Sequence, residues 1–191
     1  MEKFPELDNQ QQTDLAWLGA MINGEGYVDV ESIKRGDKFY FSPRLSIANT
    51  DPAIIVRCTE ILRSILVNYY ICKTGTTTGK NRQCYSIRVD KLSQLHRLLQ
   101  AIIPWMVGEK QAKAKLVMDY VQSRFARTDG KLARNQHSSV PYSDEEKGIV
   151  QKLGSWMFNE HTFSEAEMLL RCALDSGRKP ENAAEMTASA A

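Results

Sequence analysis

The run from Leu18 to Gly26 limits what this chain can fold into more than any other part of it. It starts as an apolar stretch with small residues, which suits a helix, and it stops on Gly24-Glu25-Gly26. Glycine is common at helix ends and lets other backbone segments come close, so the run places Glu25 at a helix terminus. The alternating residues 27–30 then indicate a strand. A helix that ends on an acid and leads straight into a sheet holds a metal-binding carboxylate at one defined point.

Hydrophobic periodicity and turn residues divide the following chain into helices and hairpins. Thr13 is expected to cap a helix over residues 14–24, and Asp51-Pro52 is expected to open another that runs to residue 66. This order of elements predicts an α+β fold, an αββαββα core with a four-stranded, mostly antiparallel sheet. The strands are predicted at 27–33 and 39–49 around a turn at 34–37, and at 68–76 and 82–90; the later helices at 92–102 and, beyond Pro104, at 109–127.

We expect one main domain with a helical appendage. The core is predicted at residues 12–127, after a loose N-terminal arm at 1–11 and before a linker at 128–142. Ser143-Asp144-Glu145-Glu146 has the spacing of a capping box and predicts a helix through residue 159. A further helix at 164–175 completes an appendage at 143–176, and the small, polar residues 177–191 are expected to be a disordered tail.

Composition narrows the class of function. No run approaches the roughly 20 apolar residues that span a bilayer, and the first residues lack the pattern of a signal or transit peptide. The net charge is only +2, yet residues 68–127 hold 11 Lys or Arg against 3 acids, whereas residues 142–191 hold 5 against 9. A basic middle predicts a surface for a polyanion, and nucleic acid fits best. We expect a soluble, intracellular protein of a bacterial or phage-host cytoplasm or an organelle, with no membrane partner.

The sequence resembles the LAGLIDADG homing endonucleases. Leu18-Gly19-Ala20-Met21-Ile22-Asn23-Gly24-Glu25-Gly26 is similar to their signature motif, in the variant that ends in Gly-Glu-Gly. Residues 43–51 resemble the family's second strand and the start of its second helix, and Ile103-Pro104 with residues 110–116 resembles its later proline and Lys-Gln-rich helix start. The similarity covers residues 12–127. It implies the family's saddle-shaped sheet and a site-specific double-stranded DNA endonuclease.

The resemblance also implies a metal site. The family's last motif acid binds the catalytic divalent cation, and here that acid is Glu25. The carbonyl of Gly24 is expected to add a ligand, as in similar enzymes. Oxygen ligands suit Mg²⁺, with Mn²⁺ or Ca²⁺ able to substitute for binding. Asn23 replaces the family's usual first acid, at a position that mainly serves packing and capping.

Further catalytic roles follow from the same resemblance. Lys110 matches the family's active-site lysine, and Lys113 and Lys115 are the alternatives if the match slips along the helix. Asn49 or Asp51 resembles a polar position that orients solvent at the end of the second strand. Asp51 is equally well explained as the cap of the following helix.

Alternation along the predicted strands leaves one face of the sheet apolar and the other polar. Arg can bind guanine edges, while Ser, Thr and Tyr supply shorter contacts to bases or phosphates, so we expect the polar face to contact DNA. Loop lysines and arginines would bind phosphates and make affinity depend on salt. The expected DNA-binding residues of the strands are Tyr40, Ser42, Arg44, Ser46, Tyr70, Thr74, Thr76, Arg82, Ser86 and Arg88, and those of the loops are Lys34, Arg35, Lys38, Lys73 and Lys80. The alternative for each is an ordinary solvent-facing residue of an antiparallel sheet.

A stripe of small residues on the first helix predicts pairing. Ala16, Gly19, Ala20 and Asn23 recur at helical spacing and let two helix backbones approach; packing within the same domain is the alternative. The chain holds one motif, whereas the family resemblance implies two active-site acids. We therefore expect a homodimer that reads a palindromic or near-palindromic duplex and makes a staggered double-strand break. A non-cleaving nucleic-acid-binding protein, such as an intron-splicing maturase, is the alternative function.

Overall fold

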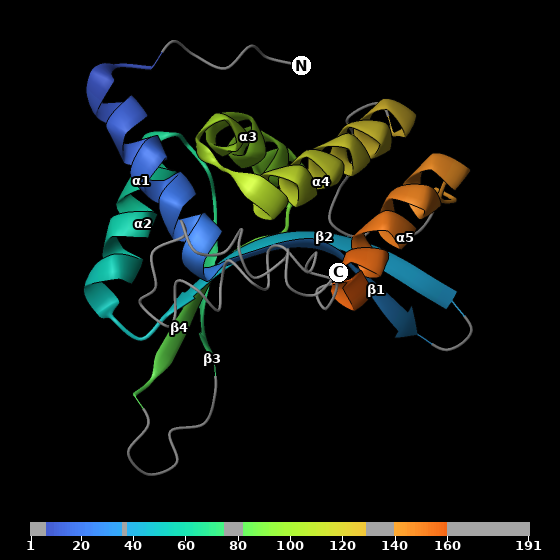
Figure 1. Cartoon of the computed structure of the whole chain (residues 1–191), viewed down its shortest axis with the longest axis horizontal. Coiled ribbons are helices and arrows are strands. Elements are labelled where there is room, and N and C mark those ends of the chain that lie inside the picture. The colour runs from blue at the N-terminus through green and yellow to red at the C-terminus, as the bar shows by residue number, and fades with distance from the viewer. Residues whose placement is uncertain (1–6, 36–37, 75–81, 129–139, 160–191) are drawn as a thin grey trace, which may run out of the picture. The chain divides into compact units, whose positions relative to one another are not determined.

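The computed structural model describes residues 7–35, 38–74, 82–128 and 140–159. Within these ranges the chain is an α+β fold in the predicted αββαββα order, followed by one more helix (Figure 1). The elements are α1 (Asn9–Glu25), β1 (Gly26–Arg35), β2 (Lys38–Asn49), α2 (Pro52–Ser64), β3 (Tyr70–Thr74), β4 (Cys84–Val89), α3 (Leu92–Ile102), the 3-10 helix η1 (Ile103–Trp105), α4 (Gly108–Arg127) and α5 (Asp144–Asn159). No helix in this part of the chain is long and apolar enough to cross a bilayer.

The four strands form one sheet in the order β1-β2-β4-β3, and every neighbouring pair is antiparallel. The pairing of β1 with β2 runs from Gly26 opposite Ile47 to Arg35 opposite Lys38. The turn predicted at 34–37 is therefore wrong in its first half, because Lys34 and Arg35 lie in β1, and β2 begins at Lys38, one residue earlier than predicted. Ladder hydrogen bonds hold these charged residues in strands although lysine has a low intrinsic preference for them.

Strand parity divides the sheet as predicted. Val28, Leu45 and Val89 form one cross-strand row, and they are at most 5% exposed. Helices α1 to α4 lie on one side of the sheet and cover this face (Figure 1). Leu15, Leu18 and Ile22 of α1, Ile61 and Leu62 of α2, Leu95 and Leu98 of α3, and Val117 and Val121 of α4 complete the core. The opposite face of the sheet remains available for contacts.

The first helix begins earlier than the sequence predicted. Asp8, not Thr13, is the N-cap, because its carboxylate accepts a hydrogen bond from Gln11 N at 2.7 Å and Gln11 Oε1 accepts one from Asp8 N at 3.1 Å. These two bonds make a capping box that satisfies backbone donors at the helix start. Thr13 instead donates its hydroxyl to the Asn9 carbonyl. Residues 9–11 thus belong to α1, and the part of the expected arm at residues 1–6 lies outside the described residues.

The other helix starts follow their local signals. Asp51 caps α2 with Pro52 at its first position, and Ser143 and Glu146 form the predicted capping box of α5. Ile149 and Leu153 of α5 are buried in the core, so the first part of this helix belongs to the compact unit that ends at Leu153. Most of the expected linker, the helix at 164–175 and the tail at 177–191 lie outside the described residues.

Candidate functional site

Glu25 is the last residue of α1, and its side chain is exposed. Gly26 follows as the cap, with its backbone N–H donating to the Ile22 carbonyl. A Cβ at Gly26 would lie 2.6 Å from the Ile22 carbonyl oxygen, so only glycine fits where the helix turns into β1. The carboxylate is thereby held where α1 meets the sheet, as the sequence predicted.

Lys110 reaches this helix end from the first turn of α4. Its Nζ donates to the Ile22 carbonyl at 3.1 Å and to the Gly24 carbonyl at 3.3 Å. The last carbonyls of a helix lack intrahelical donors and carry partial negative charge, which favours a cation there. Burial lowers the pKa of Lys110, while the nearby charge of Glu25 acts in the opposite direction. An ammonium group therefore lies beside the motif carboxylate, and 88 positions separate Lys110 from Ile22 in the sequence.

The alternative lysines have other contacts. Lys113 pairs with Glu109 at 2.8 Å, and Lys115 donates to Gln111. Lys110, the lysine that the family resemblance favoured, binds the end of α1 in this structure. Asn49 Oδ1 accepts a hydrogen bond from Asp51 N at 2.8 Å, and Asp51 Oδ1 accepts one from Ala53 N at 2.8 Å. The helix-cap interpretation of Asp51 is therefore confirmed, and the solvent-orienting role of either residue stays a prediction.

The small residues of α1 are partly buried within the domain and partly exposed to solvent. A Cβ at Gly19 would lie 2.8 Å from both Cβ and the carbonyl oxygen of Trp105. Gly19 thus packs within its own domain, which corrects its assignment to a pairing surface. Asn23 Oδ1 accepts a long hydrogen bond of 3.4 Å from Val107 N. Ala20 is exposed, and a Cβ at the exposed Gly24, four residues on, would meet nothing within 4 Å.

The open face of the sheet carries the predicted polar residues in cross-strand rows. One row runs from Tyr27 through Ser46 and Arg88 to Tyr70. Burial raises the pKa of Tyr27 to about 12, with the charges of Asp29 and Glu31 adding to the effect. The pKa of Tyr70 is raised by burial and by its hydrogen bond to Asp90 at 2.9 Å. Both phenols therefore stay protonated near neutral pH, and each hydroxyl donates to an acid of its own chain, Tyr27 to Asp29 and Tyr70 to Asp90.

The open face also carries acids that the expected DNA-binding set left out. Glu31 accepts a hydrogen bond from Arg44 Nη1 at 2.8 Å, and Asp29 accepts bonds from Val30 N and from the Tyr27 hydroxyl. Alternation in the sequence had placed Asp29 and Glu31 on this face. Their partners depended on the register of β1 with β2, which puts Arg44 directly opposite Asp29.

The remaining predicted DNA-binding residues are placed as follows. Lys34 and Lys73 lie in β1 and β3, not in loops, and Arg82 precedes β4. The register places Arg35 opposite Lys38. Thr76 and Lys80 lie outside the described residues. The strand residues Tyr40, Ser42, Ser46, Thr74 and Ser86 share the open face with Arg44 and Arg88 by parity, but Ser86 is buried.

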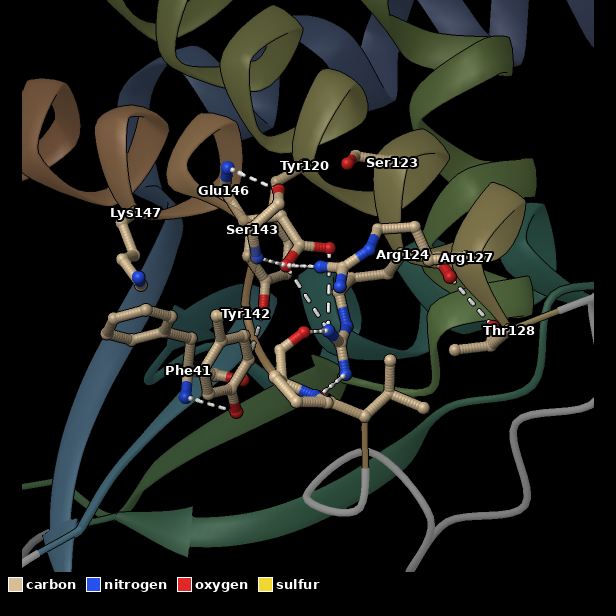
Figure 2. A network of polar contacts seen from close by, with 12 residues as sticks. Phe41, Tyr120, Ser123, Arg124, Arg127, Thr128, Tyr142, Ser143, Glu146 and Lys147 are labelled. Carbon is tan, nitrogen blue, oxygen red and sulfur yellow. Dashed lines mark hydrogen bonds and ion pairs between the residues drawn. The ribbon is translucent and has the colours of Figure 1, made fainter.

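The basic excess of residues 68–127 is not gathered on this face. Arg124 of α4 is fully buried and pairs with Glu146 of α5 at 3.2 Å, while Arg127 pairs with the same carboxylate at 2.9 Å (Figure 2). Sequence reasoning counted both arginines toward a polyanion surface and did not single out this network. The sequence signal for this network was the acid-rich start of α5. Glu146 lies three residues after Ser143, and the capping box holds its carboxylate at the start of the helix.

The end of α1 presents oxygen groups that suit a hard cation. Within the described ranges no three His, Cys, Asp or Glu side chains gather as a metal site. Each chain offers the Glu25 carboxylate and the Gly24 carbonyl, both of them oxygen ligands. Magnesium is commonly bound by one or two carboxylates together with water and substrate phosphates, so this donor set fits Mg²⁺.

Comparison with known proteins places the fold. No family model matches the sequence, and no curated protein matches it either. Among solved structures, the homing endonuclease I-CvuI in complex with its target in the presence of Ca is similar with a TM-score of 0.57 and 18% identity over 90% of this chain and 99% of that one. The homing endonuclease I-CeuI complexed with DNA follows with a TM-score of 0.52 and 9% identity over 79% and 69%. The LAGLIDADG homing endonuclease I-SmaMI bound to cleaved DNA has a TM-score of 0.50 and 18% identity over 78% of this chain and 45% of that chain.

Proposed function

We propose that this chain, whose fold is that of the LAGLIDADG homing endonucleases, is a metal-dependent endonuclease that cuts double-stranded DNA as a homodimer. The observation that carries the proposal is the meeting of Glu25 and Lys110 at the exposed C-terminal end of α1. A carboxylate and an ammonium group at one point are suited to binding a cation and an anionic phosphate. Likeness to DNA complexes of the same fold supports DNA as the substrate.

Pairing of two copies supplies the second acid. A double-strand cut requires chemistry at two phosphates, and each chain contributes one motif glutamate at position 25. Ala20 and Gly24 form an exposed line of small residues that ends beside this glutamate. Contact between two such lines around a two-fold axis brings the two carboxylates together at the seam. A symmetric dimer then reads a palindromic or near-palindromic site, with one cut in each strand giving staggered ends.

The chemistry assigned to the site is phosphodiester hydrolysis. Glu25, with the Gly24 carbonyl that also accepts from Lys110, would hold the divalent cation. A bound Mg²⁺ would supply Lewis-acid activation of water and charge stabilisation at the leaving oxygen. Lys110 holds the end of α1 through its two carbonyl contacts and keeps positive charge near the reacting phosphate. Burial lowers the pKa of Lys110, and the charge of Glu25 opposes that shift and favours the ammonium form.

The open face of the sheet reads the duplex in this proposal. Arg44 and Arg88 contact guanine edges in the major groove, and the serines, threonines and tyrosines of the same face contact bases or phosphates. Arg35, Lys38, Lys80 and Arg82 serve phosphate binding in this proposal, with Asn49 and Asp51 as secondary catalytic candidates. The strand register puts Lys34 and Lys73 on the helix-covered face, so they are not given a DNA contact. Glu31 orients Arg44 by holding one of its terminal nitrogens.

The test is selection of cleaved sites from a random duplex library with Mg²⁺. Wild-type protein should yield symmetric sites, and EDTA should abolish cutting. Glu25→Gln should still retain the selected duplex but cut it about 10²–10³-fold more slowly, the range for loss of one group that stabilises transition-state charge. Glu60→Gln, an exposed carboxylate of α2, is the matched control and should cut normally. Cutting by Glu25→Gln at the wild-type rate would refute the proposal.

A non-cleaving nucleic-acid-binding protein, such as a splicing maturase, is the second candidate. It is favoured by the side chains of Asn49 and Asp51, both of which already accept backbone hydrogen bonds at the start of α2. Binding of intron RNA or duplex DNA that is unchanged by EDTA and by Glu25→Gln, with no cut product, would support it over the endonuclease.

A further inference from the structure

The hairpin of β1 and β2 extends well past the rest of the sheet. β4 pairs with β2 only from Leu45 to Asn49, so residues 38–44 of β2 have β1 as their strand neighbour and no other among the described strands (Figure 1). We call residues 29–35 and 38–44 the distal hairpin. At about 3.4 Å per residue it extends for roughly 20 Å. A two-stranded hairpin is marginally stable by itself, so a segment of this length needs support from other elements.

Tyrosine hydroxyls bind the free edge of β2 where β4 no longer reaches it. The backbone N–H of Phe41 donates to the Tyr142 hydroxyl at 3.0 Å, and the Phe41 carbonyl accepts a hydrogen bond from the Tyr120 hydroxyl at 3.4 Å. The ring of Phe41 also packs on the ring of Tyr142, with centroids 4.5 Å apart (Figure 2). The two hydroxyls thus take the place of a neighbouring strand at this point of an open edge.

Tyr142 is itself held firmly by two helices. The guanidinium of Arg124 lies over its ring, with Cζ 4.8 Å from the centroid. Arg124 donates to Glu146 and to the Val140 carbonyl, and Ser143 N donates to the same carboxylate at 2.8 Å (Figure 2). Because Arg124 and Glu146 are buried, this network fixes residues 140–146 against α4. The position of Tyr142 is therefore set by the core and not by the hairpin.

We propose that Tyr142 is a positioning residue that sets the distal hairpin on the DNA and thereby controls discrimination among the base pairs farthest from the cut. The inference rests on the proposed DNA-cleaving function. Tyr40, Ser42 and Arg44 project from the distal hairpin onto the open face, whereas the half of the hairpin nearest Glu25 is braced by β4. At about 3.4 Å per base pair, the distal hairpin covers about six outer base pairs of each half-site.

The experiment compares the cleaved-site profiles of wild-type protein, Tyr142→Phe and the control Tyr69→Phe. Tyr142→Phe keeps the ring and removes only the hydroxyl that binds Phe41. Its preference for the best base should fall about fivefold to tenfold at the outer six positions, within the range of a weakened base contact, and stay unchanged at the central positions. Tyr69 lies before β3, away from the contacts of the distal hairpin, so Tyr69→Phe should keep the wild-type profile.

Amide hydrogen exchange supplies an independent measurement. In Tyr142→Phe the Phe41 amide should exchange at least about tenfold faster, because its hydrogen-bond acceptor is gone, while amides of β4 should not change. A wild-type profile at the outer positions, or an equal loss of preference at every position, would overturn the inference and leave the nuclease proposal standing. Wild-type protein that binds no DNA would overturn both.

Discussion

The buried pair of Arg124 and Glu146 offers the sharpest test of how α5 is held to the core. Arg124 is 1% exposed in its side chain and Glu146 is 0% exposed, so neither charge is solvated by bulk water. Removing one partner leaves the other charged and buried, which typically costs 3–5 kcal/mol. Replacing both by apolar residues of similar volume is often neutral, because the desolvation of both charges is avoided. The single and double variants should therefore differ strongly from additivity.

The structure ranks the two single variants. Arg124→Met leaves Glu146 with Arg127 at 2.9 Å and with Ser143 N, so we expect a loss of about 3 kcal/mol, the low end of the range. Glu146→Leu removes the carboxylate from Arg124 and also the capping contact of Ser143, so we expect about 5 kcal/mol. The double variant Arg124→Met/Glu146→Leu should lose about 1 kcal/mol, which is the worth of the lost cap.

Urea unfolding followed by circular dichroism measures all four proteins. One protein concentration must be used throughout, since the stability of a dimer depends on it. Thermal unfolding gives a second measurement. At about 2–4 °C per kcal/mol, the melting temperatures of the single variants should lie roughly 6–20 °C below that of wild type. Single variants that each lose less than about 1 kcal/mol would show that water reaches the pair. A double variant that loses the sum of the singles would show that the two residues act independently.

Three further predictions address the core and the pairing surface. Burial lowers the pKa of His96, whose Nε2 has no hydrogen-bond partner within the described chain. The folded state therefore binds fewer protons than the unfolded state. As pH falls through about 6.5, wild type should lose stability relative to His96→Leu, as measured by urea midpoints. Gly19→Ala would bring a methyl group within 2.8 Å of Trp105 and should cost about 1–3 kcal/mol in thermal unfolding, whereas Gly148→Ala, which meets open space, should not destabilise. Ala20→Leu should keep the fold and give monomers in sedimentation, and a persistent dimer would move the pairing surface elsewhere.

Local patterns in the sequence were sufficient for most of the fold. Asp51-Pro52 and Ser143-Asp144-Glu145-Glu146 marked helix starts that the structure has, because a cap involves groups only a few residues apart. Period-two alternation assigned β1 and β2 to their faces for the same reason. The start of α1 was predicted too late, because Thr13 has the residue type of a cap, whereas the equally local pair of Asp8 and Gln11 forms the cap.

The candidate site was predictable in part. The glycines around Glu25 placed it at the end of α1, a family resemblance selected Lys110, and the structure puts Lys110 near Glu25. The charge count of residues 68–127, in contrast, included Arg124 in a predicted basic surface, although Arg124 is buried against Glu146. The sequence also left open whether Gly19 faces a partner or its own domain, and Trp105 covers it.

The sequence by itself determined the order of helices and strands, which face of each strand is apolar, and that an acid ends the first helix. These properties depend on backbone dihedrals and on neighbours within one or two turns. Only the tertiary structure decided that Lys110 binds the carbonyls of α1, that Arg44 pairs with Glu31, and that Tyr142 completes the edge of β2. Each of those contacts joins two different elements, beyond the reach of local patterns. The electrostatics of a charge depend on which partner packing brings to it and how much water packing removes.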